Sequence, residues 1–197
     1  MTLNGPTTWL IRHAESEGNA GRPTETPASN PLTERGHAQA GELAARFEQP
    51  PDVVVLSPYL RTQQTAAPLI ARFPQVLVEE WPVQEFTFLA PAKYAGTTEA
   101  QRRSSVQAYF AACDPMARDG LGAESFEEFI GRVDSMLLRA LELRDSWNVI
   151  FTHGYVMKAV LWRQQHPQAA VDRSFMAGFL DFHRCTVVAN GEIIRLA

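Results

Sequence analysis

Short apolar runs of β-prone residues alternate along the chain with segments whose apolar positions recur at helical spacing. Four runs, at residues 7–11, 52–57, 75–79 and 148–152, predict strands. The run at 52–57 is apolar almost without a break, as is typical of a parallel strand covered on both faces. Strands that alternate with helices predict an α/β fold with a mostly parallel sheet.

The predicted helices lie between and after these runs. One begins near Thr33, one spans 60–72, one ends near Cys113, one begins at Ser125 and one spans about 155–163. The helix at Ser125 is the clearest, because residues 125–128 have the spacing of a capping box and an apolar stripe at helical spacing follows. Helices on both faces of the sheet give a three-layer sandwich.

The last part of the chain carries a turn signal. Asn190-Gly191 lies between two apolar segments, residues 185–189 and 192–196, and this dipeptide favours a tight hairpin turn. We therefore expect a C-terminal antiparallel hairpin beside the parallel strands. No repeat or linker divides the chain, so residues 1–197 are expected to form one domain. The segment of about 81–123 is the candidate for an excursion that covers the substrate.

Composition limits the partners of the protein. The chain has 197 residues, of which 45% are hydrophobic and 20% charged, with a net charge of −4, so it lacks the basic excess of a general nucleic-acid binder. Cys113 and Cys185 are too far apart in sequence for a CxxC zinc motif. There is no apolar run of membrane-spanning length, and residues 1–6 do not resemble a signal peptide. We expect a cytoplasmic protein without a nucleic-acid or membrane partner. Its oligomeric state stays open, a homodimer included.

Candidate chemistry collects where strands end. Arg12 and His13 follow the first strand, and His153 and Gly154 follow the fourth. Arg61 belongs to the first turn of the helix after the second strand. Because ligands of open α/β sheets bind at the carboxyl ends of the strands, these side chains are expected to meet at one edge.

This set of side chains suits phosphoryl chemistry. Arginine binds phosphate oxygens bidentately and keeps its charge, and a neutral imidazole is a competent nucleophile towards phosphorus. A second imidazole can stabilise charge on the phosphoryl oxygens as it develops. A carboxylic acid is also needed, because the leaving alkoxide must be protonated.

Four segments, in order along the chain, resemble the histidine phosphatase superfamily, which includes the cofactor-dependent phosphoglycerate mutases. They are residues 12–19, 30–40, 56–66 and 151–154, with Arg12-His13 in the first and Thr152-His153-Gly154 in the last. The resemblance implies that His13 is the nucleophile and forms a phosphohistidine.

The resemblance also assigns the remaining roles. Arg12 and Arg61 bind the phosphoryl group, with Asn19 near it, while His153 completes the pocket and Gly154 adds to phosphate binding. The acid/base belongs in the loop after the third strand. There Glu85 is the best-placed carboxylate, with Glu79 and Glu80 as alternatives close by.

The sequence departs from the family pattern in places. Ala14 stands where many members have glycine, and residues 86–91 differ from the Gly- and Trp-containing run of broad-specificity members. The chain is also too short for the long insertion of the mutases, which favours water as the final phosphoryl acceptor. We therefore expect a phosphomonoesterase that acts on a small phosphorylated substrate with no metal or other cofactor. The alternatives are a phosphoglycerate-type mutase and a non-catalytic phospho-ligand binding module.

Motifs of other enzyme classes are incomplete or missing. Residues 13–15 match the H-x-E fragment of zinc deaminases, but the P-C-x-x-C partner motif does not occur. The sequence contains no HExxH, Walker A or GxGxxG motif, which excludes the usual metalloprotease, P-loop and dinucleotide-binding readings.

Overall fold

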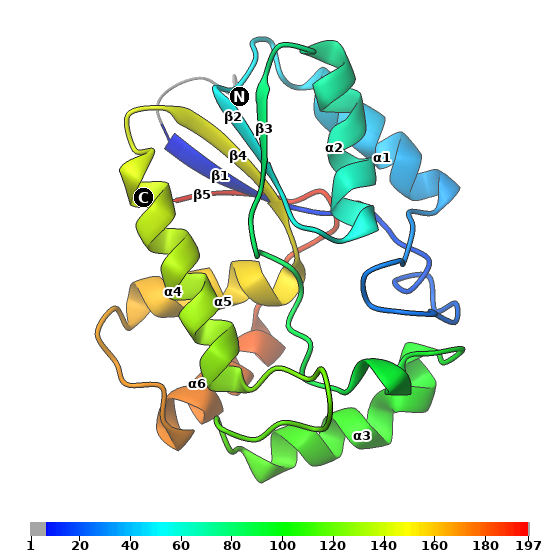
Figure 1. Cartoon of the computed structure of the whole chain (residues 1–197), viewed down its shortest axis with the longest axis vertical. Helices are drawn as coiled ribbons and strands as arrows, with labels where there is room; N and C mark the ends of the chain where they lie inside the picture. Colours follow the sequence, from blue (N-terminus) through cyan, green and yellow to red (C-terminus); the bar gives the residue numbers. More distant parts are fainter. Residues whose placement is uncertain (1–6, 197) are drawn as a thin grey trace.

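A computed structural model describes residues 7–196, in which five strands form one mixed sheet (Figure 1). The strands are β1 (Thr7–Arg12), β2 (Val53–Leu56), β3 (Leu77–Glu80), β4 (Trp147–Thr152) and β5 (Ile193–Arg195). Their order is β3-β2-β4-β1-β5. The first four are parallel to their neighbours, and β5 runs antiparallel to β1. The predicted α/β class with a mostly parallel sheet is confirmed.

The described part of the chain contains six α-helices. They are α1 (Glu34–Ala45), α2 (Leu60–Arg72), α3 (Glu99–Ala112), α4 (Phe126–Glu142), α5 (Gly154–Gln165) and α6 (Arg173–Cys185). Of these, α3 lies away from the sheet (Figure 1). The helix α4 begins as predicted, because the Ser125 side chain accepts from the Glu128 backbone N–H and the Glu128 side chain accepts from the Ser125 backbone. Thr33 caps α1 in a similar way through the N–H of Gly36.

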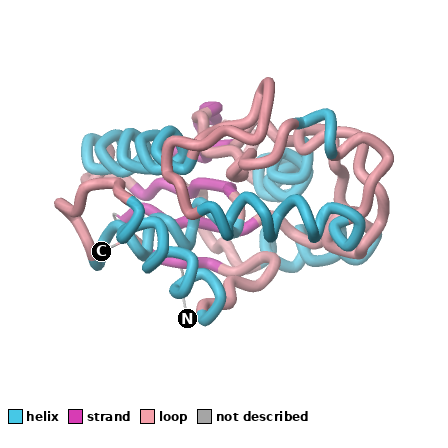
Figure 2. Tube along the Cα trace, turned by 90° about the horizontal axis from the view of Figure 1, so that it is seen from below, coloured by secondary structure: helices cyan, strands magenta, loops and turns pink. Residues whose placement is uncertain are grey.

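Two hydrophobic cores lie on the two faces of the sheet. Alternate residues of β1 point to opposite faces, so Trp9 and Ile11 pack with α1 and α2, whereas Leu10 packs with α4, α5 and α6. Figure 2 shows helices above and below the strands. The three-layer arrangement predicted from the sequence is therefore present.

The C-terminal hairpin was a wrong prediction. Its first arm does not form a strand, because Cys185 is the last residue of α6 and the residues up to 192 are irregular. The Asn190-Gly191 turn exists, with Gly191 at φ +74° and a hydrogen bond from Glu192 N to Ala189 O. However, the turn packs on the end of β1, where Arg12 N donates to Glu192 O and Gly191 N donates to Arg12 O. The strand after the turn consequently pairs with β1.

The sequence reading also missed α6. Its four buried residues, Phe175, Met176, Phe179 and Leu180, have helical spacing, and Asp172 caps the helix by accepting from the N–H of Phe175. Both signals are visible in the sequence. The prediction of a strand beginning at Cys185 left this segment unassigned.

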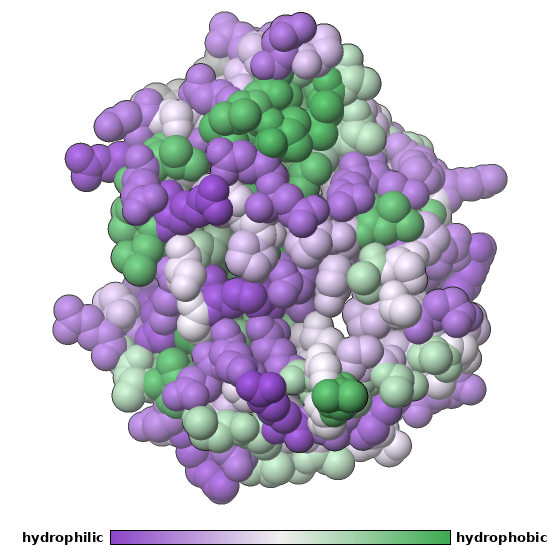
Figure 3. Space-filling model, in the orientation of Figure 1, coloured by the Kyte–Doolittle hydropathy of each residue, from purple (hydrophilic) through white to green (hydrophobic). Residues whose placement is uncertain are grey.

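The surface is mostly polar on the face shown in Figure 3, with several apolar patches, one of which lies over the edge strand β3. Leu77 and Val78 of that strand are exposed.

The segment 81–123 leaves the sheet after β3, forms a long loop with a 3-10 turn (Pro91–Lys93), and then forms α3. Among the described residues, there is no helix with the length and apolar character that a membrane span requires.

Candidate active site

The pairing of β1 with β4 brings two histidines together. Arg12 is the register partner of Thr152, and the His13 N–H donates to Thr152 O at 3.0 Å. The side chains that follow, His13 and His153, have ring centroids 5.1 Å apart. Ser57, immediately after β2, shares a hydrogen bond of 2.8 Å with Nε2 of His153. Three strand ends thus meet at one edge of the sheet, as expected from the sequence.

The contacts of His13 define its tautomer. The guanidinium Nε of Arg61 donates to Nε2 of His13 at 3.0 Å, and a guanidinium can only donate. Nε2 is therefore unprotonated, and Nδ1 carries the proton that it donates to Ala14 O at 2.7 Å. Burial holds the pKa of His13 well below its usual 6.5, and the charges of Arg61 and Arg12 lower it further. His13 is a neutral imidazole with a lone pair on Nε2.

The two arginines are held by backbone carbonyls. Arg61 donates through Nη1 to Pro27 O at 2.7 Å, and Arg12 donates through Nη1 to Val188 O at 2.6 Å. Burial lowers the pKa of Arg61 to about 10, with the charge of Glu85 opposing this effect, so both side chains stay cationic at neutral pH. These carbonyl contacts use one nitrogen of each side chain and leave others free for a ligand.

His153 and Gly154 lie next to the side chains of His13 and Arg12. The His153 side chain is fully buried, its Nδ1 has no hydrogen-bond partner among the described residues, and burial keeps its pKa well below 6.5. Gly154 begins α5, and a Cβ atom at this position would lie 3.4 Å from Nε of Arg12. Neither residue lines the cavity described below. His153 and Gly154 instead pack against His13 and Arg12 on the side away from the cavity.

Asn19 lies at the surface with its carboxamide oriented by neighbours. Its Oδ1 accepts from the backbone N and Oγ of Ser16 and from Nδ2 of Asn190. These donors leave Nδ2 of Asn19 as the free donor. Asn190 also donates to His13 O at 2.9 Å, so the C-terminal turn holds both residues. The sequence reading treated Asn190 only as a turn former and missed this contact.

Glu85 lies in the loop after β3, and its Oε1 accepts two backbone N–H bonds of 3.1 Å, from Phe86 and from Tyr155 in the first turn of α5. Burial raises the pKa of Glu85, while the charges of Arg61 and Arg12 and the two hydrogen bonds oppose this rise. The alternative Glu79 instead pairs with Arg139 and lies outside the cavity.

These residues surround a cavity of about 150 Å³. It is lined by Arg12, His13, Ser16, Gly18, Asn19, Thr24, Thr26, Pro27, Asn30, Arg61, Glu85, Phe86, Thr87, Tyr94, Glu99 and Arg102. This volume suits a phosphoryl group and a small part of its ester. A larger groove of about 500 Å³ lies at the opposite ends of the strands and contains none of the candidate site residues.

The described residues include no group of three or more His, Cys, Asp or Glu side chains that could hold a metal ion. Three arginines (Arg12, Arg61 and Arg102) and the imidazole of His13 line the cavity, together with the carboxylates of Glu85 and Glu99. This arrangement has the chemistry that a dianionic phosphoryl group requires, with a candidate nucleophile, His13, and a candidate acid, Glu85, at the same cavity.

Comparisons with known proteins show the family and the fold of the chain. The model of the histidine phosphatase superfamily (branch 1) matches residues 8–177. No curated protein matches the sequence. Solved structures with the same fold include the α-ribazole phosphatase of Shigella flexneri, with 24% identity, a TM-score of 0.70 and coverage of 96% of this chain and 89% of that one.

Two further structures are similar to the same degree. Phosphoserine phosphatase of Entamoeba histolytica, in complex with 3-phosphoglyceric acid, has 18% identity and a TM-score of 0.72, with 97% of this chain and 90% of that chain covered. The mycobacterial glucosyl-3-phosphoglycerate phosphatase complexed with VO3 has 18% identity and a TM-score of 0.72, with coverage of 98% and 91%. The chain therefore belongs to branch 1 of the histidine phosphatase superfamily.

Proposed function

We propose that the protein is a phosphomonoesterase that hydrolyses a small phosphorylated substrate through a phosphohistidine on His13. The observation that carries the proposal is the state of His13, whose neutral Nε2 faces a cavity that two arginines share. A structural histidine would need neither a fixed lone pair nor cationic neighbours at a cavity.

The first step transfers the phosphoryl group to the protein. Arg12 and Arg61 bind its oxygens, and the Arg61 Nε–H leaves Nε2 of His13 for these oxygens. The lone pair of Nε2 then forms a bond to phosphorus as the ester P–O bond breaks. Protonated Glu85 gives its proton to the leaving oxygen, and an alcohol departs.

The second step returns His13 to its starting state. Glu85, now a carboxylate, takes a proton from a water molecule whose oxygen bonds to phosphorus. The P–N bond breaks, inorganic phosphate forms, and the electron pair returns to Nε2. Nδ1 of His13 keeps its proton and donates it to Ala14 O during both steps, so the imidazole needs no change of tautomer.

The other predicted residues support the phosphoryl group. We assign the free Nδ2 of Asn19 as a further donor to its oxygens. His153 packs beside the His13 ring and limits its position, and Gly154 lies next to the guanidinium of Arg12. Loop and helix residues of the segment 81–123 line the cavity, which supports the idea that this segment covers the substrate.

The substrate is small in this proposal. The cavity volume leaves little enclosed space beyond the phosphoryl group. The structural neighbours are named for α-ribazole, phosphoserine and glucosyl-3-phosphoglycerate phosphatases, all of which act on small phosphorylated compounds. Water as the acceptor separates this proposal from a phosphoglycerate-type mutase, which would transfer the phosphoryl group to a second hydroxyl.

The test measures phosphate release from an aryl phosphate with excess EDTA, together with rapid acid-free trapping of the phosphorylated protein. The proposal predicts EDTA-resistant turnover and a phosphoryl group on His13 that is labile in acid and stable in base. His13→Ala should reduce turnover to background. Near-normal turnover of that variant would refute the role of His13. Turnover that requires a bisphosphorylated primer and releases no phosphate would identify a mutase, and tight binding of phosphate esters without turnover would identify a binding module.

A further inference from the structure

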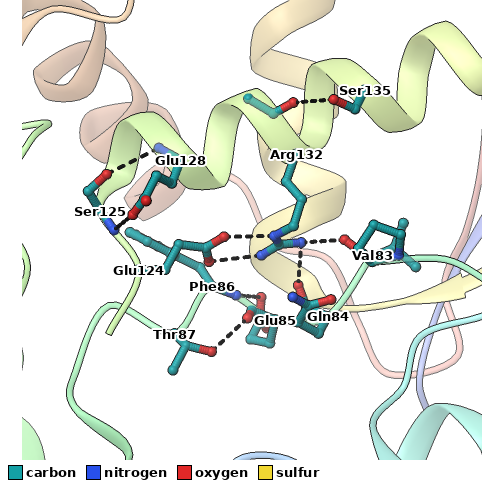
Figure 4. A network of polar contacts seen from close by, with 12 residues as sticks. Val83, Gln84, Glu85, Phe86, Thr87, Glu124, Ser125, Glu128, Arg132 and Ser135 are labelled. Carbon is teal, nitrogen blue, oxygen red and sulfur yellow. Dashed lines mark hydrogen bonds and ion pairs between the residues drawn. The ribbon is translucent and has the colours of Figure 1, made fainter. Parts of the chain in front are cut away.

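We propose that Arg132 is a positioning residue for the proton transfer by Glu85. The inference rests on the proposed function, in which Glu85 is the acid and base. Arg132 lies on α4 and does not line the cavity. It contacts the backbone that carries Glu85 (Figure 4).

The guanidinium of Arg132 uses all three nitrogens. Nη1 donates to Pro82 O at 2.8 Å and to Gln84 O at 3.1 Å. Nε and Nη2 donate to the two carboxylate oxygens of Glu124 at 2.7 and 2.9 Å. Both partners of this ion pair are largely buried, with side-chain exposures of 13% and 17%. A bidentate, largely buried pair has one geometry, so the direction of Nη1 towards the loop is fixed.

The pair holds the chain on both sides of Glu85. Arg132 binds the carbonyl of Gln84, which precedes Glu85, and the backbone N–H of Glu124 donates to the carbonyl of Thr87, two residues after it, at 2.8 Å. Figure 4 shows Glu85 on the loop between Gln84, which Arg132 contacts, and Thr87. The side chain of Glu85 is held separately, by the N–H groups of Phe86 and Tyr155. The Arg132–Glu124 pair therefore fixes the position of the loop backbone relative to α4. The two N–H groups fix the carboxyl group of Glu85 on that loop.

Loss of Arg132 should act on one step of the reaction. The residues that bind and attack the phosphoryl group come from other elements, namely the β1 end for His13 and α2 for Arg61. Of the residues assigned to the phosphoryl transfer, only Glu85 lies on this loop. Misplacement of a reacting group by about 1 Å can cost about 100-fold in rate. Poor leaving groups need protonation more than good ones, so they should lose more.

The experiment compares Arg132→Met with a matched control, Arg139→Met. Arg139 lies two turns further along α4, pairs with Glu79 and stacks over Trp81 at 4.3 Å, just before the loop. Both substitutions remove a cation that pairs with a carboxylate and contacts an aromatic ring. Only Arg132→Met also removes the hydrogen bonds to the loop carbonyls. kcat/KM is measured for an alkyl phosphate and for an activated aryl phosphate.

We expect Arg132→Met to lower kcat/KM by about 10- to 100-fold for the alkyl ester and several-fold less for the aryl ester. Arg139→Met should keep the wild-type ratio of the two substrates. Arg132→Lys retains one donor for the loop carbonyls. It should restore part of the wild-type ratio of kcat/KM between the alkyl and aryl esters. Equal losses on both substrates, or the same change of ratio in Arg139→Met, would overturn the proposal, because a general loss of structure predicts either result.

A double substitution separates this inference from the proposed function. In the Glu85→Gln background there is no acid to misplace, so adding Arg132→Met should change the alkyl rate little. Full additivity of the two losses would show that Arg132 acts elsewhere. If Glu85→Gln alone leaves the ratio unchanged, the role of Glu85 fails first. If Arg132→Met does not fold, Glu124→Gln, which weakens the same pair, replaces it in this comparison. An unchanged substrate ratio in that variant would count against the proposal.

Discussion

Replacing Glu85 with glutamine should remove a proton from the site and change little else. Oε1 of Glu85 accepts the N–H groups of Phe86 and Tyr155, and a glutamine carbonyl oxygen can accept the same two bonds. The amide nitrogen then takes the position of Oε2. The variant keeps the shape and hydrogen bonds of the loop but has no group that can release a proton to a leaving alkoxide.

General acid catalysis contributes about 10²- to 10⁴-fold to rates, so kcat for an alkyl phosphate should fall by about that factor. The aryloxide of an activated aryl phosphate departs without much protonation, so kcat for this substrate should fall about tenfold or less. Glu80, the neighbouring carboxylate that the sequence offered as an alternative, is exposed and lies outside the cavity. Glu80→Gln is therefore the matched control and should behave as wild type.

The pH dependence gives a second readout of the same variant. Because burial raises the pKa of Glu85, the wild-type rate should stay high above the ordinary glutamate value of 4.5 and fall as pH rises through the raised pKa. Glu85→Gln should lack this fall. A raised pKa in the folded state also means that the wild-type protein loses stability as pH increases through that range. Glu85→Gln has no such group, so its Tm should rise relative to the wild-type Tm as pH increases. Equal rate losses on both esters, with an unchanged pH profile, would refute the reasoning.

Three further outcomes are expected. His13 and His153 have folded-state pKa values well below 6.5, so the unfolded chain binds their protons first and Tm should fall as pH decreases below about 6.5. Thermal unfolding between pH 5 and 7 measures this, and a Tm that rises on acidification would contradict it. Asn190→Ala removes the donors to His13 O and Asn19 Oδ1 and should weaken inhibition by vanadate about tenfold; an unchanged inhibition constant would show that the turn does not shape the pocket. Phe86→Ala removes a fully buried ring and should cost about 3–5 kcal/mol in chemical denaturation, with a loss below 1 kcal/mol contradicting the packing.

The sequence predicted the scaffold well because the scaffold depends on local signals. Strand and helix periods, together with the caps at Thr33 and Ser125, placed the parallel strands and most helices. Strand ends then indicated which side chains would meet, since His13 and His153 directly follow strands that pair in register.

The rest of the site depends on contacts that local signals do not encode. A motif cannot show that His153 is covered by His13 and excluded from the cavity, because that depends on side-chain packing. The partners of Asn190 are equally non-local. Its dipeptide predicts a turn, but the surface on which the turn packs is decided by residues at the other end of the chain. Asn190 also lies beyond residues 8–177, which the family model matches.

The position of Asn190 also has a consequence for the order of folding. It is 177 residues away from His13 in sequence, and β5 pairs with β1 over a similar distance. Such non-local contacts form slowly, because closing a long loop costs entropy before the contact is gained. During refolding, most helical structure should therefore return before the site can bind phosphate. A ribosome-bound chain that has not yet released its C-terminal turn would carry every family motif and an incomplete pocket.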